Sequence, residues 1–157
     1  LLGKEKASFL HSLDHLQDPG NLGTIMRAAE AAGVTGILMS SDCVDIYNPK
    51  TIRSTMGALY RVPFVVSEDF AGDIERLKKA GVSTYAAHLG ATISYEGADY
   101  KKPCAFMIGN EANGLSDEVA ALADCKILIP MAGQVESLNA AMAATVLMFE
   151  AARQRRN

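Results

Sequence analysis

The sequence predicts a single α/β domain with a mostly parallel sheet flanked by helices. Three observations lead to this expectation. Short apolar runs alternate with helical segments along the whole chain, as they do in βαβ units. No internal repeat, low-complexity stretch or Pro/Ser-rich linker interrupts the alternation. The 157 residues, 49% of them hydrophobic, suffice for one well-buried core and are too few for two comfortable domains.

The strands are expected in six short runs with apolar, β-forming cores. In chain order these runs are 8–14, 36–40, 62–66, 83–88, 104–109 and 126–131. Runs of this length between turn-forming or polar residues are typical of strands in a buried, largely parallel sheet.

The segments between these runs are expected to be helices. They cover residues 22–32, 48–60, 69–81, 116–124 and about 137–154. Their predicted ends are marked by residues that cap helices or occupy a first turn: Gly33, Asn48, Pro49, Gly81, Ser116 and Ser137. The last helix is apolar around much of its circumference, so we expect it to be buried on two sides, by its own sheet and by a partner.

Charge and composition limit the function classes. With 15 basic and 18 acidic residues the formal net charge is −3, so the composition indicates no general nucleic-acid-binding surface. A local basic site is compatible with this net charge. The C-terminal cluster Arg153, Arg155 and Arg156 is interpreted as a solvated helix end.

The three cysteines lack paired spacing, and no signal segment or membrane-length apolar run occurs, so we expect a cytoplasmic protein without a membrane partner.

Three stretches carry polar residues that folding alone does not require. "NLGTIMRAAEAAG" (21–33) places Arg27 among small and apolar neighbours, while "IGNEANGLS" (108–116) and "IPMAGQVESLNAA" (129–141) follow predicted strands. In open α/β sheets, ligands bind beyond the carboxyl ends of strands, where glycines such as Gly109 and Gly114 let a backbone approach them. Taken singly, the second stretch could be an ordinary polar turn, the third a capped helix start, and Arg27 a surface residue.

Together, in this order and spacing, the three stretches resemble the motifs of the SpoU (TrmH-type) branch of the SPOUT RNA methyltransferases. The resemblance runs from about Leu13 to the C-terminus and includes "NPKTIRSTMGALYRVPF" (48–64). It implies a C-terminal deep trefoil knot, a homodimer, and methyl transfer from S-adenosyl-L-methionine to a ribose 2′-hydroxyl of rRNA or tRNA. Relatives usually carry a preceding RNA-binding domain, so we expect residues 1–157 to be the catalytic domain alone.

The resemblance also assigns residues to roles. The cofactor-binding positions it implies are Gly109, Ile129, Leu138, Met131, Leu89 and His88. The positions it implies for chemistry and substrate placement are Asn21, Arg27, Glu111, Ser137 and Asn139. RNA contacts are expected from Arg27, Arg53 and Ser54, although a solvated helix face would explain the last two equally well.

The chemistry of these residues refines the assignment. A guanidinium stays protonated in proteins, so we interpret Arg27 as a cationic clamp on the nascent 2′-alkoxide or the adjacent phosphate rather than as a general base. Glu111 is expected to orient Arg27 or Asn21, or else to cap the following turn. Ser137 and Asn139 can also cap a helix. No metal site is expected, because the histidines are not at ligand spacing with cysteines or carboxylates.

Two other function classes compete with this interpretation. The first is a non-catalytic knotted module that binds RNA or a protein. The second is a nucleotide-binding oxidoreductase, which the absence of a GxGxxG fingerprint disfavours. Titration with S-adenosylmethionine and with a dinucleotide separates the three.

Overall fold

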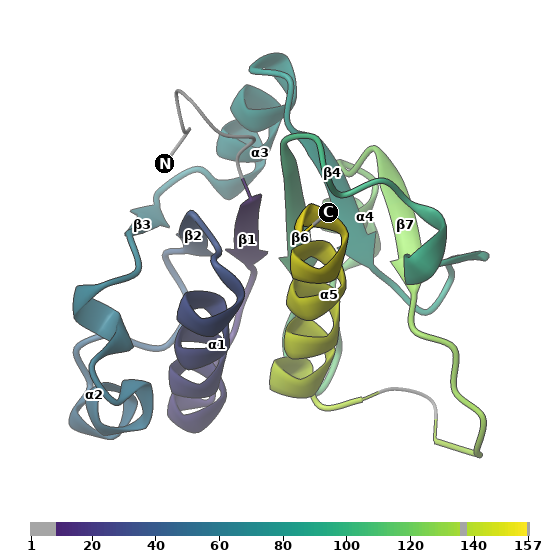
Figure 1. Cartoon of the computed structure of the whole chain (residues 1–157). Coiled ribbons are helices and arrows are strands. Elements are labelled where there is room, and N and C mark those ends of the chain that lie inside the picture. The colour runs from purple at the N-terminus through teal and green to yellow at the C-terminus, as the bar shows by residue number, and fades with distance from the viewer. Residues whose placement is uncertain (1–8, 136–137, 157) are drawn as a thin grey trace.

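Seven parallel strands form one sheet in the part of the chain that the computed structural model describes, residues 9–135 and 138–156. Their spatial order is β3-β2-β1-β6-β4-β7-β5 (Figure 1). The strands are β1 (Phe9–Leu13), β2 (Gly36–Ser40), β3 (Phe64–Ser67), β4 (Ser83–Ala87), β5 (Ile93–Ser94), β6 (Cys104–Ile108) and β7 (Cys125–Leu128). The sheet prediction is confirmed; the two-residue β5 is the strand it missed, because so short a run has no detectable period.

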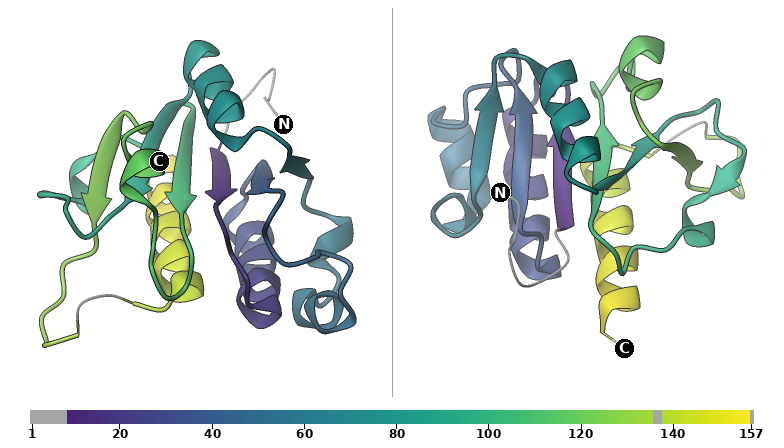
Figure 2. Two further views of the ribbon diagram at one scale, coloured as in Figure 1. Left: turned by 180° about the vertical axis from the view of Figure 1, so that it is seen from behind. Right: turned by 90° about the horizontal axis from the view of Figure 1, so that it is seen from above.

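The helices cover both faces of the sheet. They are α1 (Pro19–Ala32), α2 (Pro49–Thr55), α3 (Phe70–Lys79), α4 (Asp117–Ala120) and α5 (Ala140–Arg155), with single 3₁₀ turns η1 (Ala58–Tyr60) and η2 (Tyr95–Gly97). Figures 1 and 2 show α1, α2 and α5 on one face and α3 and α4 on the other. No helix in the described ranges is both long enough and apolar enough to cross a membrane.

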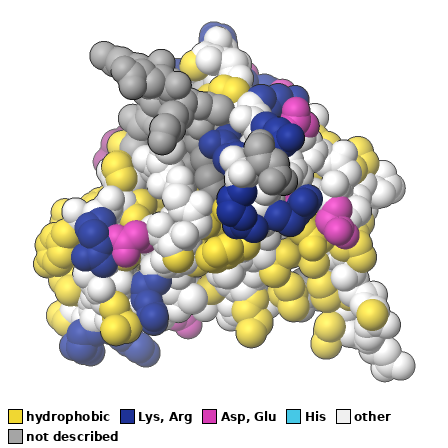
Figure 3. All heavy atoms as spheres, in the orientation of Figure 1, with side chains coloured by type: hydrophobic (Ala, Val, Ile, Leu, Met, Phe, Trp, Pro, Cys, Tyr) yellow, Lys and Arg dark blue, Asp and Glu magenta, His cyan; other side chains and the backbone are white. Residues whose placement is uncertain are grey.

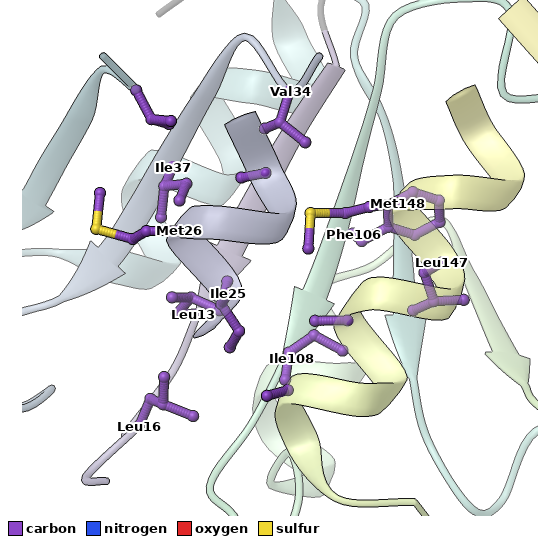
Figure 4. Close-up of a cluster of buried hydrophobic side chains, with 14 of the residues drawn as sticks. Leu13, Leu16, Ile25, Met26, Val34, Ile37, Phe106, Ile108, Leu147 and Met148 are labelled. Carbon is purple, nitrogen blue, oxygen red and sulfur yellow. The ribbon is translucent and has the colours of Figure 1, made fainter. Parts of the chain in front are cut away.

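The core has two layers because side chains alternate along each strand. On β6, Cys104, Phe106 and Ile108 face the cluster under α1 and α5, whereas Ala105 and Met107 face the cluster under α3 and α4. Figure 4 shows the first cluster, where Ile25 of α1 and Leu147 of α5 approach the strands from the same side. This burial on both faces explains the continuously apolar strand sequences.

Several helix ends differ from the prediction for local reasons. The first helix begins at Pro19, three residues early, because the Asp18 carboxylate accepts a hydrogen bond from the Asn21 N–H. The second ends at Thr55, because Met56 (φ 48°) and Gly57 (φ 90°) both take left-handed conformations before η1.

The predicted bounds of the fourth and last helices also need correction. The fourth helix is only α4, residues Asp117–Ala120, although Ser116 caps it as expected. The last helix begins at Ala140, because Asn139 rather than Ser137 is its N-cap residue. The expected caps at Gly33 and Asn48 are confirmed.

Strand order brings distant loops together. β1 lies between β2 and β6, and its last residue Leu13 is in register with Ile108 at the end of β6. The Asp14 N–H donates to the Ile108 carbonyl at 2.9 Å, so the loops that follow β1 and β6 leave the sheet side by side. β7 enters between β4 and β5, which both precede it in the chain, before α5 returns to pack on α1 and β6.

The three cysteines are free. Cys104 is fully buried, and burial raises the pKa of its thiol to about 11. Cys43 and Cys125 are half-buried.

Candidate active site

A cavity of about 350 Å³ opens at the carboxyl ends of β4, β6 and β7. The first two turns of α5 close one side of it. The lining includes the ends of the three strands, the 109–115 loop and apolar side chains of α5. Ligands are expected at this edge of a parallel sheet, because loops there diverge and leave room between them.

The structure places all six predicted cofactor positions on this cavity. They are Gly109, Ile129, Leu138, Met131, Leu89 and His88, and they come from three different loops and the segment before α5. Leu89 is 68% exposed and therefore lies at the mouth, whereas Ile129 and Leu138 are half-buried. The positions are thus gathered as the resemblance requires, and their role in binding remains a prediction.

The loop after β6 is shaped by its own backbone. Asn110 and Gly114 exchange backbone hydrogen bonds of 3.2 and 2.7 Å, and the Asn110 side-chain oxygen accepts from the N–H groups of Ala112 and Asn113. A Cβ on Gly109 would lie 2.3 Å from the Leu115 nitrogen, and Gly114 has φ +67°. The two glycines are therefore required by the conformation of the loop itself, in addition to any approach of a ligand.

Glu111 holds the chain at the start of α1. Its Oε1 accepts hydrogen bonds from the backbone N–H groups of Gln17 at 2.9 Å and Asp18 at 2.8 Å. Within the described residues its carboxylate makes no hydrogen bond or ion pair with Arg27 or Asn21, so the expected orienting contact is corrected. The alternative is corrected too, because Asn110 and not Glu111 caps the following turn. Glu111 acts on these residues through the backbone that precedes their helix, and it also lines the cavity.

Asn21 and Asn139 connect the N-terminal ends of α1 and α5. Asn139 Nδ2 donates to Asn21 Oδ1 at 3.3 Å, while its own Oδ1 accepts from the N–H groups of Ala141 and Met142. Asn139 also lies between two residues that line the cavity, Leu138 and Ala140. Ser137, the other predicted member of this motif, lies outside the described residues.

Arg27 is exposed on α1 and is absent from the lining of the cavity. It follows Gly23 by one turn, and Gly23 touches α2 so closely that a Cβ there would lie 2.1 Å from Ser54 Cβ. Arg27 has no ion-pair or hydrogen-bond partner in the described ranges. The structure therefore separates the predicted cationic clamp from the predicted cofactor positions.

The two predicted RNA contacts on α2 are placed differently. Arg53 is exposed. Ser54 packs on Gly23, and its hydroxyl donates to the Lys50 carbonyl at 2.8 Å. Packing between helices thus accounts for Ser54, and its contact with RNA remains a prediction.

A bridge between His88 and Asp117 was not foreseen. His88 Nδ1 accepts from the Gly90 N–H at 3.0 Å, so the other ring nitrogen, Nε2, donates to Asp117 Oδ1, also at 3.0 Å. Both residues line the cavity, one from the end of β4 and one from the first turn of α4. No sequence signal linked them, because the contact depends on the position of β4 beside β6.

A second group of titratable side chains lies at the ends of β1 and β2. His15 pairs with Asp42 and lies 3.6 Å from Asp14. Ligand atoms of these three side chains lie within 4.8 Å of one another, contrary to the expectation that the histidines are not at ligand spacing with carboxylates. Burial raises the pKa of the Asp14 carboxyl. The side chain of Asn110 donates to the His15 carbonyl at 3.0 Å, so this group supports the loop that lines the cavity.

Comparison with known proteins agrees with this geometry. Residues 9–149 match the model of the SpoU rRNA Methylase family. The chain belongs to the SpoU rRNA methylase family. Its fold is accordingly that of the SPOUT methyltransferases, with a trefoil knot in the C-terminal half.

Two similar relatives illustrate the match. This SpoU chain is 41% identical over 142 residues to a tRNA/rRNA methyltransferase of Synechocystis, covering 90% of the chain and 52% of the relative. It is 35% identical over 137 residues to the 23S rRNA (guanosine(2553)-2′-O)-methyltransferase RlmP of Bacillus subtilis, covering 87% and 55%. The chain thus spans about half the length of these relatives.

A solved structure gives the same result in three dimensions. The SpoU methyltransferase AviRb from Streptomyces viridochromogenes, in complex with AdoMet, has a TM-score of 0.89 and 33% identity to this SpoU chain. The match covers 99% of the chain and 63% of AviRb.

Proposed function

We propose that the chain transfers a methyl group from S-adenosylmethionine to a ribose 2′-hydroxyl of ribosomal or transfer RNA. The observation that carries the proposal is the cavity at the carboxyl ends of β4, β6 and β7, closed by α5, in a chain of the SpoU family. The name of the Bacillus subtilis relative RlmP states 2′-O-methylation of 23S rRNA, and the AviRb complex contains AdoMet.

The residues around the cavity suit this cofactor. Its volume, about 350 Å³, falls within the range of roughly 300–1,000 Å³ that small-molecule sites occupy. Ile129 and Leu138 offer apolar walls for an adenine ring, and backbone groups of the loops and at the start of α5 offer hydrogen-bond partners for polar atoms. We assign the six predicted positions around the cavity to cofactor binding, with Leu89 at the mouth.

The chain must then place and stabilise the attacking oxygen. When bound, S-adenosylmethionine supplies an electrophilic methyl group on its sulfonium sulfur. In-line attack requires the ribose oxygen on the far side of that carbon and a positive group near the charge that develops on it. As the new C–O bond forms, the C–S bond would break to release S-adenosylhomocysteine, and the hydroxyl proton would pass to water. We assign the role of this positive group to Arg27, because the family motif points to it and it is an exposed cation without an ion-pair partner among the described residues.

The remaining motif residues position the two helices. Glu111 fixes the backbone before α1, and Asn139 fixes the start of α1 to the start of α5. The ribose would lie between the cavity and α1. We keep Ser137 as a residue for substrate placement on the basis of the family motif alone.

We further propose that the protein is a cytoplasmic homodimer. Met142 is 61% and Phe149 40% exposed, and their spacing of seven residues places them on one face of α5. A second copy that covers this face would bury the second side of the helix. The free, unpaired cysteines suit a reducing compartment.

Calorimetric titration with S-adenosylmethionine, S-adenosylhomocysteine and NAD tests the cofactor assignment. We expect saturable binding of both adenosyl ligands and none of NAD. Ala143→Leu, which fills the cavity from α5, should lower the affinity at least tenfold, whereas Ala71→Leu, at an exposed alanine on α3, should leave it unchanged. Gly109 is unsuitable for this test, because a side chain there would disrupt the loop.

The other outcomes identify the alternatives. A folded protein that binds neither adenosyl ligand would be the non-catalytic module. Binding of NAD alone would favour the oxidoreductase.

Transfer itself is tested with methyl-tritiated S-adenosylmethionine and unmodified rRNA or tRNA. Nuclease digestion followed by chromatography should place the label on a 2′-O-methylated nucleoside. Label on a base instead of the ribose would contradict the proposed reaction.

The dimer is tested by sedimentation equilibrium. Phe149→Glu should convert a dimer into a folded monomer. A chain that is monomeric at all concentrations would contradict the dimer and leave the cofactor assignment intact.

A further inference from the structure

One part of the surface combines cations with exposed apolar side chains and lies away from the cavity. It comprises the exposed face of α2, η1 and the adjoining part of α1, with Arg27, Lys50, Arg53, Met56 and Tyr60 as its members; we call it the α2 surface. Figure 3 shows basic side chains gathered over α2 and the neighbouring part of α1, separate from a second basic group around the C-terminal end of α5.

Two contacts hold this surface in a fixed arrangement. Gly23 and Ser54 join α1 to α2 at a separation that leaves no room for a Cβ on the glycine. Seven residues after Gly23, both Oε atoms of Glu30 accept hydrogen bonds from the Arg61 guanidinium. This ion pair joins α1 to the residue that follows η1. Arg27 lies four residues after Gly23 and three before Glu30. It is therefore on the side of α1 that faces α2 and η1, although its own side chain is exposed.

The charges leave a local excess of cations. Glu30 neutralises Arg61, but Arg27, Lys50 and Arg53 have no ion-pair partner among the described residues. Residues 44–61 contain one carboxylate, Asp45, against three basic side chains. A chain with net charge −3 therefore presents positive groups here.

Large apolar side chains interrupt these cations. Tyr60 is 80% and Met56 69% exposed, and Met56 is held outward at the left-handed end of α2. Such an interleaved surface suits a single nucleic-acid strand, because phosphates bind the cations while a base stacks on the ring. A protein partner would instead favour a continuous apolar centre with charges at its rim.

We propose that the α2 surface binds an unpaired stretch of RNA, with phosphates on Lys50 and Arg53 and an unstacked base on Tyr60, while Arg27 at its edge keeps its role at the target ribose. The inference rests on the proposed function and deepens it. The substrate RNA would then be a loop or a single strand. Tyr60 would be a positioning residue for the nucleotide that is methylated.

Fluorescence anisotropy tests the proposal with two probes, a labelled mixed-sequence 12-nucleotide RNA and its duplex. The full chain, with S-adenosylhomocysteine present, should bind the single strand at least fivefold more tightly. Tyr60→Ala should weaken binding of the single strand about tenfold with the salt dependence unchanged, and Tyr60→Phe should restore it. Tyr47→Ala is the matched control, since Tyr47 is also exposed but packs edge-on against Phe64.

Arg53→Gln should have a different signature. It should weaken single-strand binding and also lower the slope of log affinity against log salt by about 1, because one phosphate contact is lost. Arg76→Gln, on α3 and behind the sheet, should change neither.

Three results would overturn the proposal: no binding of either RNA by the unaltered chain, equal binding of strand and duplex, or a normal affinity of Tyr60→Ala. Conversion of a dimer to a monomer by Tyr60→Ala would assign the surface to a second copy instead. Cofactor titration of the same samples distinguishes these failures from failure of the proposed function, because Tyr60 lies outside the cavity and its substitutions should leave cofactor binding intact.

Discussion

Asn139 donates a hydrogen bond of 3.3 Å to the side-chain oxygen of Asn21, and this contact joins the starts of α1 and α5 through two residues that are 118 positions apart in the sequence. The same Asn139 side chain caps α5 through its oxygen. The stability of the α5 cap therefore depends on the Asn139 Oδ1 atom, whereas the alignment of α5 with α1 depends on its Nδ2 atom.

Two substitutions of Asn139 should separate these functions. Asn139→Asp keeps the capping oxygen but loses the donor to Asn21, so we expect near-normal unfolding free energy and at least tenfold slower methyl transfer. Asn139→Ala should also lose about 1 kcal/mol of stability, the typical cost of an N-cap. Urea unfolding and single-turnover transfer measure the two effects; equal rates for Asn139→Asp and the unaltered chain would argue against an alignment role.

Glu111 should act mainly on the backbone before α1. In Glu111→Ala, the N–H groups of Gln17 and Asp18 lose their carboxylate acceptor, and we expect their amide hydrogens to exchange at least tenfold faster. Global stability should fall by about 1 kcal/mol, because water can reach these exposed groups. Hydrogen exchange followed by NMR resolves the two amides, and unchanged exchange at both would rule out this anchoring.

Arg27 should matter for transfer and little for folding. Arg27→Gln removes an exposed cation without an ion-pair partner in the described ranges, so the unfolding free energy should change by less than about 0.5 kcal/mol while transfer falls at least 100-fold. Arg27→Lys should retain part of the activity if positive charge suffices. Complete loss in the lysine variant would instead indicate bidentate guanidinium geometry.

Gly23 should be the least tolerant glycine of α1. Gly23→Ala would place Cβ 2.1 Å from Ser54 Cβ and 2.8 Å from the Ser54 carbonyl carbon, so α2 must move away. We expect a loss of about 1–3 kcal/mol, as for other overpacked contacts. Gly20→Ala is the control, because its Cβ would meet only the side chain of Asp18, at 3.1 Å. Thermal unfolding should rank Gly23→Ala below Gly20→Ala, and the reverse order would contradict the close contact.

Alkaline pH should destabilise the fold partly through Cys104. Burial raises the pKa of this thiol from its ordinary 9.0 to about 11, so the folded chain keeps a proton that the unfolded chain loses. The contribution is complete below about pH 9 and is lost as the pH rises toward 11, at about 1.4 kcal/mol per pH unit.

Comparison with Cys104→Ala isolates this contribution. Burial also raises the pKa of the Tyr100 hydroxyl, so both proteins should lose stability in alkali. The loss should be steeper for the unaltered chain in urea unfolding between pH 8 and 11. Equal slopes would mean that the Cys104 thiol titrates normally.

Local patterns in the sequence determined the elements and the positions of the site loops. The apolar runs predicted six of the strands, and Asn48, Ser116 and Gly33 marked helix ends correctly, because capping depends on atoms a few residues apart. The motif residues predicted which loops form the candidate site, since loops after parallel strands meet at one edge of the sheet.

Only the tertiary structure decided which side chains meet. The pairing of β1 with β6 places Glu111 on the backbone of Gln17, and the packing of α1 on α2 assigns Ser54 to a helix contact. The packing of α5 on α1 places Asn139 on Asn21, and strand order puts His88 beside Asp117. These contacts follow from strand order and helix packing, which depend on the burial of the whole apolar surface and leave no local period in the sequence.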